Sequence, residues 1–165
     1  MIKDLYVKVA QFETQLGPDA RQLSQCKNGC SKCCYTDISV FEVEANNIRN
    51  WFLSLSPEEQ INVRSNWMIP RKDGACAFLR NESCTIYEAR PLICRTQGLA
   101  LKFVSNEQAS IDICPLNEDM LGVMEEKEVL NLDLLNTILS QIERSDSSNE
   151  MRPRTSLNSL QDQLK

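Results

Sequence analysis

The stretch "CKNGCSKCC", from Cys26 to Cys34, concentrates four thiols in nine residues, and the last two are adjacent. Four more cysteines follow along the chain at Cys76, Cys84, Cys94 and Cys114. The residues between the first four are polar loop formers, and Gly29 supplies the unusual backbone angle that a tight loop needs. The fold must therefore accommodate a sulfur-rich loop.

Composition places the chain among ordinary globular proteins. Its 165 residues are 42% hydrophobic, which suits one domain with a sizeable core. The net charge is −5 and the 18 basic residues are scattered, so nucleic acid is not an expected partner. No apolar run approaches the roughly 18 residues of a membrane span, so no membrane association is expected. The first residues lack a signal-peptide pattern, which predicts a cytoplasmic protein with reduced thiols.

The chain contains no histidine, which limits its chemistry. Cys-His and Ser-His nucleophilic dyads are excluded, as is proton transfer by histidine. Any reaction must use sulfur, carboxylate, tyrosine, lysine or arginine side chains, or a group that sulfur binds. No catalytic residue is assigned from the sequence, and whether the protein is an enzyme stays open.

Apolar residues recur with helical spacing over several segments, so the predicted fold is mainly α. Helices are expected over residues 2–16, 19–25, 41–55, 57–68 and 118–142. The third and fourth follow capping-box patterns, "SVFE" (39–42) and "SPEE" (56–59).

Between Pro70 and Pro115 the helical periodicity is lost, which predicts short elements, with a strand near 99–104. We therefore expect one small helical domain over 1–143. It would contain a loop-rich cysteine metal centre in a motif core of 26–115. Residues 144–165 are expected to form a flexible polar tail, either disordered or a loose amphipathic turn at its end.

Three interpretations of the eight cysteines are open. Free cysteine packs as a small apolar residue, which suits an isolated thiol such as Cys114 but not a polar loop. An even count permits a disulfide framework, but such frameworks mostly belong to small secreted domains. Metal or cluster ligation fits best, because thiolate is the soft ligand suited to zinc and to iron–sulfur clusters.

All eight cysteines are therefore candidate metal ligands: Cys26, Cys30, Cys33, Cys34, Cys76, Cys84, Cys94 and Cys114. The adjacent Cys33 and Cys34 constrain the site, because neighbouring side chains diverge and rarely share one tetrahedral ion. Eight thiols without imidazole allow two four-sulfur sites or one cluster with spare thiols. The expected cofactor is zinc or iron, the iron either as ions or in an iron–sulfur cluster.

The spaced motifs make the pattern specific. After "CKNGCSKCC" come "CAFL" (76–79), "CTIY" (84–87), "RPLICR" (90–95) and "CP" (114–115). With these motifs the chain resembles the bacterial cysteine-cluster family CxxCxxCC, to which zinc or iron chelation is ascribed. The resemblance covers about residues 26–115, and the first spacing here is C-x3-C in place of C-x2-C.

The resemblance extends distantly to the cysteine cluster of flagellin lysine N-methylases. Methylase activity is not carried over, because the five glycines are too dispersed for a G-x-G-x-x-G nucleotide site. Tyr87, Arg90 and Arg95 lie inside the motif and are candidate cofactor-binding residues. They either line a site beside the metal, with arginine holding an anionic ligand, or support the thiolates through hydrogen bonds.

The sequence thus predicts a metal-binding protein that chelates zinc or an iron–sulfur cluster through thiolates from two sequence blocks. Two alternatives stay open. The first is an enzyme or enzyme subunit, protein-modifying and methylase-like, whose site is built on the cluster. The second is a protein-interaction module for which the metal is only a staple. Metal ions are the partner that the sequence indicates, and a protein partner stays open.

Overall fold

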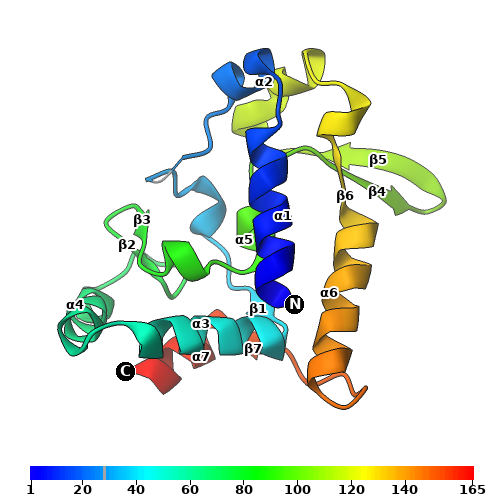
Figure 1. The fold of residues 1–165 in the computed structure, drawn as a ribbon. Helices are drawn as coiled ribbons and strands as arrows, with labels where there is room; N and C mark the ends of the chain where they lie inside the picture. Colours follow the sequence, from blue (N-terminus) through cyan, green and yellow to red (C-terminus); the bar gives the residue numbers. More distant parts are fainter. Residues whose placement is uncertain (28) are drawn as a thin grey trace. The chain divides into compact units, whose positions relative to one another are not determined.

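The computed structural model describes residues 1–27 and 29–165 (Figure 1). It is mainly helical with short strands, as predicted. The chain divides into two units that interleave along the sequence, and each is described by itself. Unit 1 comprises Met1–Cys26 and Leu92–Ser145, and unit 2 comprises Lys27–Pro91 and Asp146–Lys165. Within the described ranges, no helix combines the length and the apolar character needed to span a bilayer.

Unit 1 is built from helices and one small sheet. Its elements are α1 (Ile2–Thr14), α2 (Pro18–Leu23), α5 (Leu92–Arg95), β4 (Leu101–Ser105), β5 (Gln108–Asp112), the 3-10 helices η3 (Pro115–Gly122) and η4 (Glu126–Glu128), β6 (Leu130–Asn131) and α6 (Leu132–Asp146). The first two helices confirm the prediction. α1 buries Leu5, Tyr6 and Val9 on one face, and Pro18 begins α2 where its missing N–H costs nothing.

The predicted helix over 118–142 is wrong in its first half. Residues 115–128 form η3 and η4, and β6 then pairs in parallel with β4 before α6 begins at Leu132. The backbone N–H of Leu130 donates to the carbonyl of Ala100 at 2.9 Å, so this segment is drawn into the sheet. β4 confirms the strand expected near 99–104, and β5 pairs with it across a two-residue turn.

Unit 2 contains the remaining elements. They are the 3-10 helix η1 (Lys32–Cys34), β1 (Ser39–Val40), α3 (Glu42–Ser54), α4 (Pro57–Met68), β2 (Leu79–Arg80), β3 (Ser83–Cys84), the 3-10 helix η2 (Tyr87–Ala89), β7 (Thr155–Ser156) and α7 (Leu157–Leu164). At α4 the predicted capping box is confirmed. The Ser56 N–H donates to Glu59 Oε2 at 2.8 Å, and the Glu59 N–H donates to Ser56 Oγ at 3.3 Å.

The start of α3 differs from the prediction by two residues. Ser39 lies in β1 rather than at the helix cap, because it pairs with Ser156 of β7. Phe41 is the cap instead, and its N–H donates to Glu44 Oε2 at 3.2 Å. A glutamate of the first turn therefore still accepts the hydrogen bond of the cap N–H. Both the cap residue and the glutamate lie two residues later than predicted.

Residues 144–165, expected to be a flexible tail, carry regular structure. α6 continues to Asp146, β7 pairs with β1, and α7 lies along α3 (Figure 1). Leu157, Leu160 and Leu164 recur at helical spacing and are buried with Ile48 and Phe52 of α3. These leucines form a short apolar face in an otherwise polar segment. That face packs α7 against α3.

The core of unit 2 is aromatic, and residues of the cysteine motifs pack against it. The Trp67 ring lies 5.3 Å from the Phe52 ring and 5.5 Å from the Phe78 ring, centroid to centroid. Trp67 Nε1 donates to Thr85 Oγ1 at 2.8 Å, next to Cys84 in the chain. Cys76 and Cys84 pack against this core as partly buried residues. The core therefore supports the backbone that carries both thiols.

Candidate metal centre

The eight cysteines are all free thiols and are divided between the units. Unit 1 holds Cys26, Cys94 and Cys114, and unit 2 holds Cys30, Cys33, Cys34, Cys76 and Cys84. The boundary at Pro91–Leu92 passes through the "RPLICR" motif. Motif residues that are neighbours in sequence thus serve different units.

The cysteine loop of unit 2 is made of two consecutive turns. The Cys30 N–H donates to the Lys27 carbonyl at 3.0 Å, and Gly29 has a φ of +93°, as expected for the glycine of a tight loop. The Cys34 N–H then donates to the Ser31 carbonyl at 2.9 Å, which closes η1. These turns place Cys33 and Cys34 at the end of a short 3-10 helix. Asn28 lies outside the described residues.

One backbone hydrogen bond joins the two cysteine blocks. The Cys76 N–H donates to the Cys34 carbonyl at 2.7 Å. The Leu79 N–H donates back to the Cys76 carbonyl at 3.0 Å and leads the chain into β2. β2 and β3 form a hairpin in which Leu79 pairs with Cys84. Cys34, Cys76 and Cys84 are therefore positioned by main-chain contacts rather than by side chains.

Glu82, at the turn of this hairpin, ties the hairpin to the cysteine loop. Asn81 and Glu82 have φ values of 49° and 60°, the left-handed conformation of a two-residue hairpin turn. The Glu82 carboxylate accepts hydrogen bonds from the Ser31 hydroxyl and the Lys72 ammonium, and from the Tyr35 hydroxyl at 3.5 Å. The bonds from Lys72 and Ser31 lower the pKa of Glu82. Sequence reasoning missed Glu82, and no local pattern marks it.

The adjacent thiols Cys33 and Cys34 are electrostatically unequal. A hydrogen bond from Cys34, helped by a backbone N–H and by the charge of Arg90, lowers the pKa of Cys33 to about 6 although burial opposes it. The pKa of Cys34 is raised, first because its thiol gives that hydrogen bond and next because it is buried. Negative charge on Cys33, Cys76 and Cys84 raises it further. Four thiols, drawn from both sequence blocks, thus affect one another's pKa.

The thiols of Cys76 and Cys84 have similar surroundings. Burial raises the pKa of both thiols, to about 11 for Cys84. In each case a backbone N–H two residues later donates to the sulfur and opposes that rise, from Phe78 to Cys76 and from Ile86 to Cys84. N–H donors aimed at sulfur stabilise thiolates, which are the form that binds metal.

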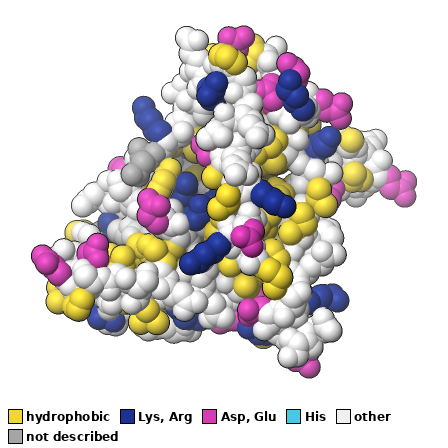
Figure 2. All heavy atoms as spheres, in the orientation of Figure 1, with side chains coloured by type: hydrophobic (Ala, Val, Ile, Leu, Met, Phe, Trp, Pro, Cys, Tyr) yellow, Lys and Arg dark blue, Asp and Glu magenta, His cyan; other side chains and the backbone are white. Residues whose placement is uncertain are grey.

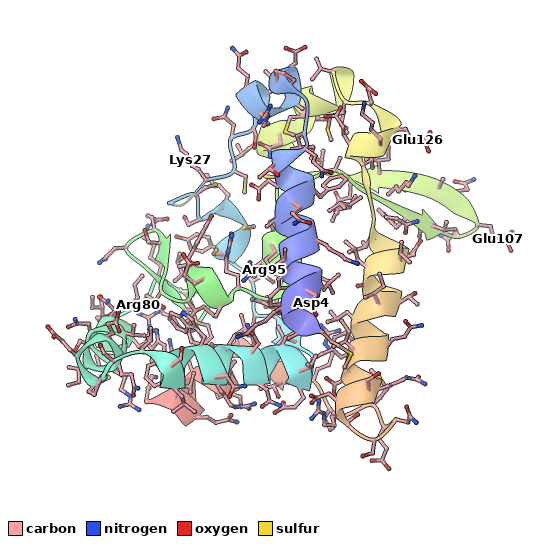
Figure 3. The ribbon with its side chains drawn as sticks, viewed as in Figure 1. Asp4, Lys27, Arg80, Arg95, Glu107 and Glu126 are labelled. Carbon is pink, nitrogen blue, oxygen red and sulfur yellow. The ribbon has the colours of Figure 1, made fainter. Side chains whose placement is uncertain are left out.

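The three candidate cofactor-binding residues are separated by the unit boundary. Arg90 lies in unit 2 with its guanidinium carbon 3.6 Å from the Tyr87 ring centroid, and its Nε donates to the Tyr87 carbonyl at 3.0 Å. Its charge helps to lower the pKa of Cys33 and opposes part of the rise in the pKa of Cys84. Arg95 belongs to unit 1, where it lies 4.3 Å over the Tyr6 ring of α1 (Figure 3). Tyr87 and Arg90 are therefore brought together beside thiols of unit 2.

In unit 1 a buried amide, Asn117, joins the segments that carry cysteines. Asn117 is 1% exposed. Its Oδ1 accepts from the Gln25 N–H at 2.8 Å, and its Nδ2 donates to the Gly98 carbonyl at 2.7 Å. Its own N–H donates to the Cys114 carbonyl at 2.7 Å. The sequence analysis missed this residue, and its place three residues after Cys114 is the only local signal.

Cys26 lies tightly against the turn that follows Cys94. The Cys26 thiol donates to the Gln97 carbonyl at 3.3 Å. Gly98 has a φ of +90°, and a Cβ there would approach the Cys26 Cβ to 2.6 Å and its sulfur to 2.9 Å. Only glycine permits this approach, so the "TQG" sequence after "CR" has a structural reason.

The donor set suits a thiophilic metal in its chemistry, although it is not drawn together as a finished ligand shell. Across residues 1–27 and 29–165, no group of three or more cysteine or carboxylate side chains is arranged to hold a metal ion. Ligation therefore requires thiols to rotate toward one another on backbones that are already close. On the face in Figure 2, Lys and Arg side chains are interspersed with Asp and Glu.

Comparison with known proteins agrees with the cysteine pattern. Residues 25–119 match the family model CxxCxxCC, described as "Putative zinc- or iron-chelating domain". No curated protein and no solved structure matches the chain. The similarity to flagellin lysine N-methylases stays a prediction. Because the match covers more than half of the sequence, the chain belongs to the CxxCxxCC family.

Proposed function

We propose that the protein chelates zinc or iron through cysteine thiolates, with its principal centre in unit 2. Cys33, Cys34, Cys76 and Cys84 are the proposed donors, and Cys30 is a further thiol of the same unit. The observation that carries the proposal is the 2.7 Å hydrogen bond from the Cys76 N–H to the Cys34 carbonyl. It brings the two sequence blocks together at the backbone, where no side-chain rearrangement can separate them.

The mutual charge effects among these thiols favour a bound cation. Each thiolate raises the cost of ionising its neighbours: after the hydrogen bond to Cys33 and burial, the negative charges of Cys33, Cys76 and Cys84 raise the pKa of Cys34 further. A metal ion reverses this repulsion, because it replaces the protons and interacts favourably with every thiolate at once. Arg90 and the backbone N–H groups of Phe78 and Ile86 already offset part of the negative charge.

The bound group would determine the chemistry. Zinc held by four thiolates would cross-link the two blocks as a structural site, whereas an iron–sulfur cluster would add redox capacity. Cys33 and Cys34 would serve the two cases differently, since adjacent side chains diverge. The neighbour that does not bind the principal ion would be available to a second metal atom.

Cys26, Cys94 and Cys114 of unit 1 remain proposed ligands as a separate set. Asn117 connects the segments of Cys26 and Cys114 with the Gly98 turn, four residues after Cys94. Three thiols would leave one position of a tetrahedral ion for another donor. This set is therefore proposed to bind metal less tightly than the set in unit 2.

The test is to purify the protein without oxygen, measure zinc, iron and acid-labile sulfide, and record the visible spectrum. A brown protein with iron and sulfide identifies a cluster, and a colourless protein with zinc identifies thiolate zinc sites. Cys84→Ser should remove the metal of the unit 2 centre. The matched variant Cys94→Ser should retain it. Absence of both metals, or full loading of Cys84→Ser and Cys76→Ser, would show the proposal to be wrong.

An enzyme or enzyme subunit built on the centre is a second candidate function. It is favoured by a hollow of about 440 Å³ whose lining includes Asp37 and the chain neighbours of Cys34 and Cys76, which are Tyr35 and Ala75. A catalytic metal needs an open coordination position near such a hollow. In cobalt-substituted protein, an open position would give absorption bands that change on adding azide. Unchanged bands would favour a closed structural site.

A further inference from the structure

Arg80 of β2, labelled in Figure 3, is a buried cation that forms no ion pair with a carboxylate of the described residues. Its side chain is 6% exposed. Nη1 donates to the carbonyls of Ala77 at 2.8 Å and Leu79 at 2.6 Å, and Nη2 donates to the carbonyl of Trp67 at 2.8 Å. Nε has no hydrogen-bond partner within the described part of the chain. Carbonyl groups orient this guanidinium, but they do not neutralise its charge.

A buried charge of this kind is costly, and a neighbouring cation adds to the cost. Burial and the positive charge of Arg71 both lower the pKa of Arg80 below its usual value. The Cys76 thiol acts in the opposite direction when it is ionised. Two arginines of one sign thus lie close together, and an anion between or beside them would relieve their repulsion.

A hollow of about 290 Å³ opens next to this pair, between the segment that follows α4 and helix α7. Arg71 and Arg80 both line it, together with the apolar Trp67 and Ile69. Lys165 and Asp162 also line it, but they form an ion pair at 3.0 Å and balance each other. The uncompensated charge in the hollow is therefore that of the two arginines.

Arg71 is placed to meet a ligand. It is exposed, and its Nη1 donates to Asn158 Oδ1 at 2.7 Å, which directs the guanidinium from the α7 side. That is its one hydrogen bond among the residues that the structure describes, so the rest of its planar fork of donors is available. Arg71 also lines two adjoining hollows of about 110 and 440 Å³. The site is thus open enough for a small molecule to enter.

We propose that this hollow binds a small oxyanion, a carboxylate or a phosphate group, through Arg71, with Arg80 supplying the buried positive charge. Guanidinium and oxyanions match in a bidentate geometry, and a partly buried site strengthens the pair. The apolar wall of Trp67 and Ile69 suits a ligand with a small organic body. The inference does not depend on the metal centre, since none of these residues is a proposed ligand.

The test follows the Nε–Hε signals of arginine in isotope-labelled full-length protein during titration with inorganic phosphate at constant ionic strength. The signals of Arg71 and Arg80 should shift and saturate. Arg71→Gln should weaken binding at least about tenfold, because the bidentate pair is lost. Arg71→Lys should lie between the two, since it keeps the charge without the fork. Parallel titration with acetate separates the sources: saturation by phosphate alone identifies a phosphate site, and saturation by both a general oxyanion site.

The control is Lys102→Gln, which removes one exposed positive charge from unit 1 and should leave the phosphate affinity unchanged. Arg80 itself holds three carbonyl groups, so its replacement can unfold unit 2, and Arg71 therefore carries the test. A shift that grows without saturation would overturn the proposal. Equal phosphate affinity in the wild type and in Arg71→Gln would overturn it as well.

Discussion

The two units hold their cysteine segments by different physical means. In unit 2, main-chain hydrogen bonds join Cys34 to Cys76, and β-pairing aligns Cys84 with Leu79. In unit 1, the buried side chain of Asn117 bridges Gln25, next in the chain to Cys26, and Gly98, and its backbone N–H donates to the Cys114 carbonyl. A backbone contact survives almost any substitution, whereas a side-chain bridge depends on one residue. The first arrangement is therefore robust and the second is vulnerable to a single change.

The largest expected effect breaks the bridge of unit 1. Asn117→Ala removes two side-chain hydrogen bonds, one partly buried from the Gln25 N–H and one buried to the Gly98 carbonyl. The buried loss costs about 1–3 kcal/mol and the partly buried one about 1 kcal/mol, so we expect about 2–4 kcal/mol of lost unfolding free energy. Urea unfolding measures it.

The matched control for that variant is Asn136→Ala, an exposed asparagine of α6 in the same unit. Alanine is the better helix former, so this change should cost nothing or stabilise slightly. If Asn117→Ala were as stable as this control, the bridge would have no energetic role and the contrast between the units would disappear.

The next expected effect is the dependence of metal affinity in unit 2 on pH. Near neutral pH Cys33, with its pKa of about 6, is ionised, whereas Cys84, with its pKa of about 11, is protonated, and the pKa of Cys76 is raised as well. Metal must therefore displace protons, at least two if Cys76 and Cys84 both bind. Apparent affinity should fall at least about 100-fold, roughly 2.7 kcal/mol, for each unit of pH lowered.

Competition with a chelator of known affinity, between about pH 6 and pH 8, measures this slope. Below the pKa of Cys33 a further proton competes, so the slope should steepen. An affinity that does not vary with pH would mean that the thiols of Cys76 and Cys84 are not ligands.

The smallest expected effect concerns the side-chain hydrogen bond from Ser31 to Glu82, which supplements the backbone contacts of unit 2. Ser31→Ala removes the hydroxyl that donates to Glu82 but leaves the Cys34–Cys76 hydrogen bond intact. We expect a loss of about 1 kcal/mol in thermal or urea unfolding, with the metal content unchanged. Ser83→Ala, exposed in the same hairpin, serves as the control and should show no loss. Loss of metal in Ser31→Ala would contradict the primacy of the backbone contacts.

Elements with strong local signals were predictable from the sequence. α1 and α4 have helical periodicity or a complete capping box, and both were confirmed. β6 was not predictable, because Leu130 becomes a strand residue only through pairing with β4. α7 was missed for a similar reason. Its three buried leucines are a sparse signal until α3 supplies the surface that covers them.

The candidate site was partly predictable. Motif spacing singled out the cysteines together with Tyr87 and Arg90, and the family match agrees with the spacing. The separation of Arg95 from Arg90 was not foreseen, because nothing local marks the unit boundary between them. Glu82, Asn117 and Arg80 were missed, since each acts through partners distant in sequence or through burial alone.

The interleaving of the units has a consequence for the order in which the protein matures. The thiols of unit 2 are all translated by residue 84, but Leu157 and Leu160, which complete its core, come more than 70 residues later. Contacts of such long range form slowly. A nascent chain therefore exposes these thiols well before the apolar residues that pack beneath them are available. We expect the supply of metal during translation to govern the yield of correctly folded protein.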